Sequence, residues 1–398
     1  MRSFPKYFYI YTGLWVLYFL QGTLYASGSS ISQAILAVVL LLSGITMIKM
    51  NYFHIPQHGF PRYIVALNII FFLVTIYGVI RLMENDNTGT QWHIYLKEFY
   101  YSLLPIYAFF FFAKRGVIQQ RELNVVSLTF IIVTILFYFK QLYEVSEIYN
   151  SESVTNNAGY MFVPLLALLP LINVSKIFKY LLLIVFAAFI LLSAKRGAIM
   201  IFIVCVLEYM YFQVKDSSKK AKIWTISIAF FFIIAGYHYS MSIISEDPLL
   251  SRRLDDTLEG NSSSRDYIYG KLIANIENQD SPIKLLIGYG ANGTTIVVGK
   301  LAHNDWLEFF IDMGLMGFAV YLFYWICFWK TRKYLINKDV KHSFFIIMTF
   351  CFLRSFLSMS INDMYIVTTF VIGYCIAQAD RERIMRCKHC ELYKRIDI

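Results

Sequence analysis

A histidine stands where a polar, glycine-containing stretch of the chain meets a long apolar run. This residue, His303, is followed by Asn304 and Asp305, and the apolar run continues to about residue 329. A neutral imidazole can accept a proton near pH 7, because its reference pKa of about 6.5 is close to ambient. His303 is therefore placed to meet a substrate that is held in a membrane but reacts in water. A histidine that merely caps a helix is the alternative interpretation.

Two arginines are further candidates for chemistry. Arg196 and Lys195 lie in the short turn SAKRG, between two apolar runs. Two cations held at a membrane edge usually have an anionic partner, although long basic side chains can also simply extend into water. Arg265 begins an amphipathic segment beside Asp266, where a surface salt bridge would also explain it. We expect Arg196 and Arg265 to converge on the same place as His303.

Other polar residues beside apolar runs could assist these three. Asn304 suits the N-terminal cap of a helix, and Asp312 lies about two turns into the apolar run, where a carboxylate is costly unless it is paired. The pair 156–157, which includes Asn157, precedes another apolar run and could line the same cavity. Arg354 and Asp363 lie near the ends of the last two runs and could pair with each other.

The elements that must position these residues are membrane helices. The chain is 58% hydrophobic and only 16% charged, whereas soluble domains carry about 25% charged residues. Apolar runs of about 20 residues recur along it, each long enough to cross about 30 Å of hydrocarbon. We therefore expect an all-α polytopic membrane protein with about 12 transmembrane helices. The expected spans are residues 7–26, 31–48, 63–80, 99–113, 123–140, 158–172, 177–193, 197–214, 223–240, 305–329, 343–360 and 364–379.

The distribution of Lys and Arg predicts the orientation of these spans. With the N-terminus in the cytoplasm, about two thirds of the 36 basic residues fall in cytoplasmic segments, as the positive-inside rule requires. The chain then divides into helices 1–9 at residues 1–240, an extracytoplasmic loop at 241–303, helices 10–12 at 304–380 and a basic cytoplasmic tail at 381–398. Within the loop, Arg265–Ile276 has the spacing of an amphipathic helix that lies on the membrane or caps the bundle.

Composition also argues against several classes of partner and cofactor. The net charge of +10 is explained by membrane orientation and contact with anionic lipid, so we expect no nucleic acid partner. Cys387 and Cys390 in the tail lack the second pair of ligands that a structural zinc site needs, so we expect reduced thiols and no metal. The stretch GYGANG lacks the strand–helix setting of a dinucleotide-binding loop. We expect no cofactor.

Three of these features, in this order, resemble the superfamily of O-antigen ligases and O-antigen polymerases, which are bacterial membrane glycosyltransferases. The first is the turn SAKRG with Arg196, and the second is Arg265 followed by Asp-Tyr-Ile. The third is the glycine turn at 288–290, followed by His303-Asn304 and then by Asp-Met-Gly at 312–314. The resemblance covers roughly residues 150–330. At the position of Lys195 the family more usually has a small or polar residue.

The resemblance implies a metal-independent glycosyltransferase in the bacterial inner membrane, with its active site facing the periplasm or cell exterior. The donor would be a glycan on undecaprenyl diphosphate, and the acceptor would be a saccharide, a lipid or a protein. By the resemblance, Arg196 and Arg265 would hold the diphosphate and His303 would be essential. The expected substrate-binding residues are Lys195, Asn304, Asn157 and Asp312.

Two alternatives stay open at this point. Twelve spans and a charge near the midplane of the membrane would also suit a polytopic transporter or flippase of lipid-linked oligosaccharides. Transporters often contain two related halves, and the sequence shows no internal repeat. Within the resembled superfamily, the motifs serve the donor, so they do not separate a ligase from a polymerase.

Overall fold

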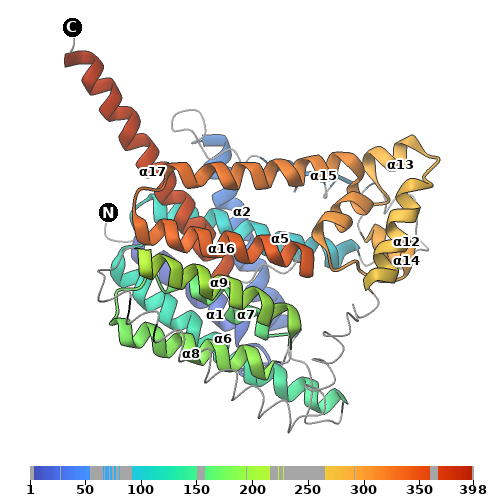
Figure 1. Ribbon diagram of the computed structural model, residues 1–398, viewed down its shortest axis with the longest axis horizontal. Helices are drawn as coiled ribbons and strands as arrows, with labels where there is room; N and C mark the ends of the chain where they lie inside the picture. The colour runs from blue at the N-terminus through green and yellow to red at the C-terminus, as the bar shows by residue number, and fades with distance from the viewer. Residues whose placement is uncertain are drawn as a thin grey trace.

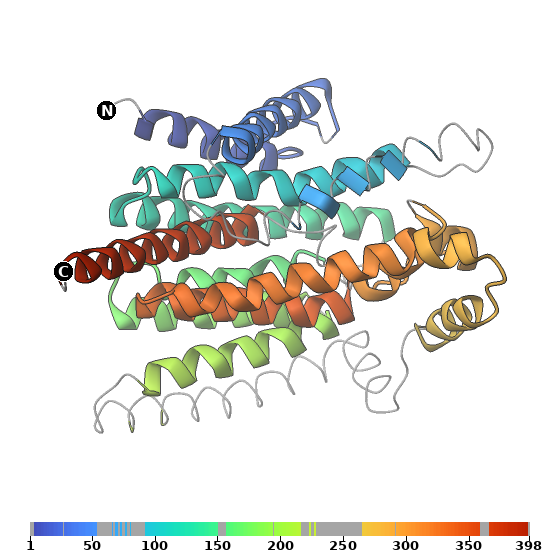
Figure 2. The ribbon, with the colours of Figure 1, turned by 90° about the horizontal axis from the view of Figure 1, so that it is seen from above.

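The computed structural model describes residues 4–26, 28–53, 92–149, 157–193, 195–215, 265–290, 292–358 and 366–396, together with a few single positions between 66 and 80 and residues 223 and 227. Its regular elements in these parts are helices that lie side by side in a bundle (Figures 1 and 2). The long helices are α1 (Phe4–Phe19), α2 (Ser30–Phe53), α5 (Trp92–Lys114), α6 (Gln120–Tyr149), α8 (Lys176–Leu192), α9 (Arg196–Lys215), α15 (Asp305–Thr331), α16 (Lys338–Leu357) and α17 (Ile366–Ile396).

The class expected from the sequence is confirmed, because the described parts are helical and apolar enough for a membrane. Five stretches there are long and apolar enough to cross one: Ser30–Met50, Gln120–Glu144, Arg196–Lys215, Asp305–Tyr334 and Lys338–Leu357. The number of 12 spans stays a prediction. Half of the predicted span 63–80 and nearly all of the span 223–240 lie outside the described residues.

The expected span at 158–172 is not a continuous helix. It consists of the short helix α7 (Gly159–Phe162) followed by a 3-10 turn, η1 (Pro164–Leu168). Pro164 lacks an N–H and its ring disfavours a continuing α-helix. Every residue from 158 to 172 is buried, and Ser343 of α16 donates a hydrogen bond of 2.6 Å to the carbonyl of Ala167. This broken segment is therefore packed inside the protein.

At one end of the bundle, α17 is held to its neighbours by charged side chains. Lys114 at the end of α5 pairs with Asp380, and Arg381 donates a hydrogen bond of 2.9 Å to the Lys114 carbonyl. Glu382 accepts hydrogen bonds from the backbone of Ile336 and Asn337, just before α16. The helix then runs on to Ile396, well past the predicted end of the last span at residue 379.

Helix α15 is interrupted at Gly314, where φ is 63° and ψ is −161°. The carbonyls of Ile311 and Asp312 accept hydrogen bonds of 2.8 Å from the backbone N–H groups of Tyr289 and Gly290. Gly288 has a φ of 75°, and a Cβ added there would lie 2.5 Å from the Asp312 carbonyl carbon. The glycine turn and the break in α15 are thus two halves of one close backbone contact, which only glycines permit at these positions.

We expect Gly314→Ala to lower the free energy of unfolding by about 2–5 kcal/mol, from backbone strain plus overpacking. The new Cβ would lie 2.4 Å from the carbonyl carbon of Leu286. Thermal unfolding in detergent, followed with a thiol-reactive dye, measures the change. The buried thiols that report unfolding are Cys205, Cys327, Cys351 and Cys375. Gly44→Ala is the control, because its Cβ would meet nothing within 4 Å. Equal midpoints for the two variants would contradict the expectation.

Three short helices lie beside the start of α15: α12 (Arg265–Glu277), α13 (Pro282–Ile287) and α14 (Gly293–Val298) (Figure 1). The predicted apolar face of α12 forms a small core, in which Ile268 and Leu272 pack with Ala302 and Ile311 of the α15 region. The helix packs on the start of α15 through these residues, and whether it also touches the membrane surface stays a prediction.

Candidate active site

His303 lies in a tight turn immediately before α15. Its φ of 53° is uncommon for a residue other than glycine, and its side chain is exposed. The buried carboxylate of Glu308 holds this turn, because it accepts hydrogen bonds of 2.5 Å from the Ala302 N–H and 2.7 Å from the Thr294 hydroxyl. A further hydrogen bond to this carboxylate comes from the His303 backbone. The fixed turn presents the imidazole on the surface at the start of α15.

Asn304 is the N-terminal cap of α15, as the sequence suggested. Its side-chain oxygen accepts hydrogen bonds from the backbone N–H groups of Trp306 and Leu307, at 3.0 and 3.2 Å. These groups have no partner within the helix, so a cap stabilises them. Asp305, the first residue of the helix, is buried and accepts a hydrogen bond of 3.0 Å from the Tyr321 hydroxyl.

Arg265 begins α12 and reaches the end of α16. Its Nη1 donates a hydrogen bond of 2.9 Å to the carbonyl of Leu357, the last residue of α16. One turn further along α12, Tyr269 lies between Arg265 and Asn304. Burial raises the pKa of the Tyr269 phenol, while the Arg265 charge and a hydrogen bond with the Asn304 side chain lower it. Tyr269, one turn after Arg265, thus links α12 to the Asn304 side chain beside His303.

The start of α15 is attached to the same part of α16. The indole Nε1 of Trp306 donates a hydrogen bond of 3.0 Å to the Ser355 hydroxyl, and its ring stacks on Phe356 with centroids 5.5 Å apart. We call residues Arg354–Leu357 the α16 terminal turn. Both α12 and α15 are fixed to this one turn.

Arg196 is brought toward the α16 terminal turn by Tyr160. The backbone at Gly197 packs against this tyrosine so closely that an added Cβ would lie 2.1 Å from its hydroxyl. The guanidinium of Arg354 lies over the Tyr160 ring, 4.9 Å from its centre, and Arg354 is fully buried. Arg196 itself is half-buried at the first position of α9. The turn between α8 and α9 is thus linked through Tyr160 to α16.

All three sequence-predicted candidates consequently belong to one end of the bundle. In both views the start of α9, the end of α16 and the helices α12–α14 lie toward the same end (Figures 1 and 2). The link between α5 and α17 through Lys114 and Asp380 lies toward the other end. The structure places Arg196, Arg265 and His303 at the same end of the bundle. Their catalytic roles stay predictions.

The remaining candidates differ in how they are placed. Asn157 is exposed, and its carbonyl accepts a hydrogen bond of 3.2 Å from Tyr160 N–H. Lys195 is half-buried beside Arg196. Asp312 is fully buried, and its Oδ1 accepts a hydrogen bond of 3.3 Å from Thr294 N–H, so its position favours support of α14 over contact with a substrate. Asp363 and Asn156 lie outside the described residues.

Glu308, Tyr160 and Trp306 are the residues that sequence reasoning did not single out. Each contacts residues that are separated from it by a long or irregular stretch of chain. Glu308 could be recognised in the sequence only as an acid in the first turn of a helix, where acids are common. Its contact with Ala302 depends on a turn that the sequence does not specify, so no pattern could have shown it.

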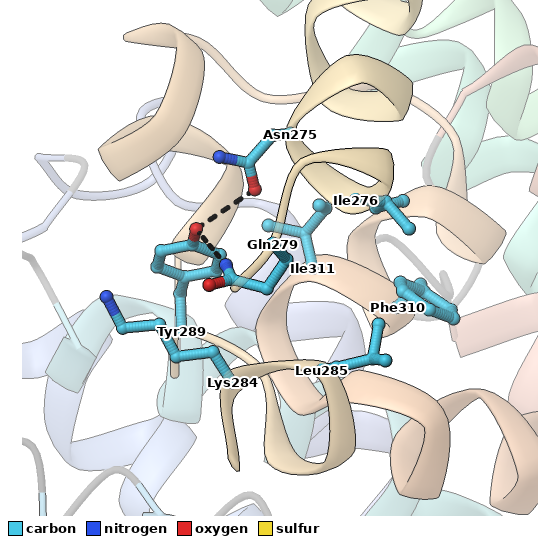
Figure 3. A pocket seen from close by; sticks show the side chains of 8 residues that line it. All are labelled: Asn275, Ile276, Gln279, Lys284, Leu285, Tyr289, Phe310 and Ile311. Atoms are coloured by element: carbon cyan, nitrogen blue, oxygen red, sulfur yellow. Dashed lines mark hydrogen bonds between the residues drawn. The ribbon is translucent and has the colours of Figure 1, made fainter. Parts of the chain in front are cut away.

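A small pocket lies among α12, α13 and α15 (Figure 3). Together with the open solvent at its mouth, it encloses about 200 Å³. On one side of it, the Tyr289 hydroxyl donates a hydrogen bond of 3.0 Å to Asn275 and accepts one of 2.5 Å from Gln279 (Figure 3). The Lys284 ammonium lies 5.1 Å from the centre of the Tyr289 ring. Because these polar groups bind one another, the pocket is best explained as the joint that holds the loop helices together.

The apolar helices indicate an integral membrane protein, and the three candidate residues lie at one end of its bundle. A family model described as O-antigen ligase matches residues 181–322, a range that contains Arg196, Arg265 and His303. The resemblance drawn from the three motifs is thereby confirmed over this range. The match indicates transferase activity of the O-antigen ligase type and lipid-linked glycans in general as substrates. A search of curated proteins finds no match to the chain.

Proposed function

We propose that this protein transfers or polymerises a glycan from an undecaprenyl-diphosphate donor, on the outer face of the bacterial inner membrane. The observation that carries the proposal is the attachment of the Arg196 turn, Arg265 and the His303 turn to a single end of the bundle, by way of the α16 terminal turn. The family match over residues 181–322 supports the reaction class.

The donor diphosphate is held by positive charge. As the glycosidic bond breaks, negative charge grows on the diphosphate leaving group, and the guanidinium groups of Arg196 and Arg265 stabilise it. A guanidinium stays charged at any physiological pH. Helices α9, α12 and α15 all begin at this end, and the N-terminal end of a helix also favours an anion.

His303 acts on the acceptor. Its imidazole accepts the proton of the acceptor hydroxyl as that oxygen attacks the anomeric carbon. Attack in line with the departing diphosphate gives inversion at this carbon. The exposed side chain on a fixed turn suits this role, because the acceptor must reach it while the donor stays in place.

The distribution of charge supports the proposed orientation. Basic residues gather at the end of the bundle opposite to the candidate site. Among the described helix ends they include Lys114, Lys176, Lys215, Lys330, Arg332, Lys333, Lys338 and Lys341. By the positive-inside rule this end is cytoplasmic, and the candidate site then faces the periplasm or cell exterior.

An in vitro reaction tests the proposal. Purified protein in liposomes is mixed with a defined glycan on a polyprenyl diphosphate and with separate acceptors, which are a second donor molecule, a glycolipid and a peptide. We expect a product heavier by the donor glycan, detected by mass spectrometry, together with free polyprenyl diphosphate. The acceptor that reacts separates polymerase from ligase. Movement of the donor between leaflets with no new product would identify a flippase instead and would overturn the proposal.

A further inference from the structure

Helix α13 exposes an apolar surface that the described parts of the protein leave uncovered. Its six residues are PIKLLI, and none of them is buried. Ile283 is 68% exposed and Leu286 is 49% exposed. Lys284 is the one charged side chain of the helix, and it is exposed as well. A short helix of this kind is costly to leave in water, so its surroundings need an explanation.

The position of α13 along α15 is fixed by the backbone. The end of α13 meets α15 at Gly314. The Cα of Gly314 approaches the backbone of Leu286 and Ile287 so closely that no side chain fits between them. The break at Gly314 divides α15 into two unlike parts. The part before the break contains three buried acids, Asp305, Glu308 and Asp312. The part after it contains no acid.

The part of α15 after Gly314 has the length and surface of a membrane span. At 1.5 Å per residue, residues 315–331 measure about 25 Å, close to the thickness of the hydrocarbon core. Near its far end, Arg332 stacks on Trp329 at 3.8 Å, a pairing of basic and aromatic side chains typical of a membrane interface. Its exposed apolar side chains are Leu315, Met316, Leu322, Phe323, Ile326 and Trp329.

We propose that α13 is an interfacial anchor, lying at the boundary between lipid headgroups and acyl chains at the level of Gly314. The exposed apolar residues of α13 continue directly into Leu315 and Met316, the first lipid-facing residues after the break. The occupant of this surface is therefore bilayer lipid. Lys284 lies at the level of the lipid phosphates, where its ammonium is favoured. The inference does not depend on the transferase reaction.

One consequence concerns the acids of α15. If the hydrocarbon begins at Gly314, Asp312 and Glu308 lie on the aqueous side of that boundary and are buried by α14. The carboxylate of Asp312, which the sequence placed two turns inside a span, then avoids the cost of a charge in hydrocarbon. The hydrophobic part of the span is shorter than the apolar run in the sequence suggested.

Spin labels on the full-length protein in liposomes test the anchor. The tail residues Cys387 and Cys390 are changed to serine, while the four cysteines of the apolar helices stay, because they are buried. One label is placed by Ile283→Cys and a second, in a separate variant, by Leu286→Cys. Collision rates with oxygen, which concentrates in lipid, and with a water-soluble nickel chelate report the depth of each label.

Matched controls calibrate the depth. The control variants are Leu322→Cys and Glu277→Cys. Leu322 lies on the exposed face of α15 inside the span, and Glu277 lies at the exposed end of α12. We expect both α13 labels to collide more often with oxygen than with the chelate, at a depth shallower than Leu322, whereas Glu277 shows the reverse. Labels on α13 that behave like Glu277 would place the helix in water. Labels shielded from both reagents would show a protein cover. Either result overturns the anchor.

Discussion

Replacing His303 with asparagine lowers kcat for glycan transfer by about 10²–10⁴-fold, the usual contribution of a general base. Asparagine tolerates the positive φ of this turn, so the backbone of the site is kept while the imidazole is lost. The KM for the donor changes little, because in the proposed mechanism the arginines, and not His303, hold the diphosphate. Initial rates with a polyprenyl-diphosphate glycan, measured in liposomes with equal amounts of inserted protein, give both constants.

The matched control for this variant is His342→Phe. His342 lies on α16 at the other end of the bundle and stacks on Phe212 with ring centroids 4.1 Å apart. Phenylalanine keeps this stacking and removes the imidazole, so we expect wild-type transfer. Wild-type kcat in His303→Asn would show that the histidine only shapes its turn, and the proposed proton transfer would be wrong.

Arg196→Lys is expected to lower kcat/KM by about 10–10²-fold, although the positive charge is kept. A guanidinium can bind two phosphate oxygens at once, and an ammonium cannot reproduce that geometry. The loss of one charge-assisted hydrogen bond, at about 1.5–3 kcal/mol, corresponds to this change. Because negative charge grows as the bond breaks, the decrease should appear more in kcat than in KM.

Arg332→Lys provides the comparison for Arg196→Lys. Arg332 stacks on Trp329 near the cytoplasmic end of α15 in the proposed orientation, so its replacement should leave both constants unchanged. A salt series adds a second readout, since binding of a diphosphate by fixed cations weakens as ionic strength rises. Full activity of Arg196→Lys would favour a side chain that merely extends to water at the edge of the membrane.

The fold could be predicted where hydrophobicity alone determines it. The runs that became α2, α6, α9 and α16 are apolar over enough residues to form a helix in lipid, whatever their neighbours are. The segment 158–172 is equally apolar, yet it is a broken helix inside the bundle. Hydropathy reflects only the free energy of transfer out of water, so it cannot separate burial in lipid from burial in protein.

The sequence offered candidate residues for the site, whose roles stay predictions, but it did not show how these residues are connected. Residue types and the order of motifs identified His303, Arg196 and Arg265. The bond from Arg265 to the Leu357 carbonyl joins residues 92 positions apart, and the packing of Gly197 on Tyr160 depends on the broken helix α7. Contacts of this kind follow from how helices pack, which no local pattern in the chain encodes.

The α16 terminal turn has a practical consequence for engineering new acceptors. Arg265, Trp306 and Tyr160 each attach to residues within Arg354–Leu357. A rotation of that single turn would shift the relative positions of all three attached segments at once. If the proposed reaction is right, libraries that diversify exposed positions such as Asn157 and leave these four residues intact should change the acceptor hydroxyl without changing how the proposed donor is bound.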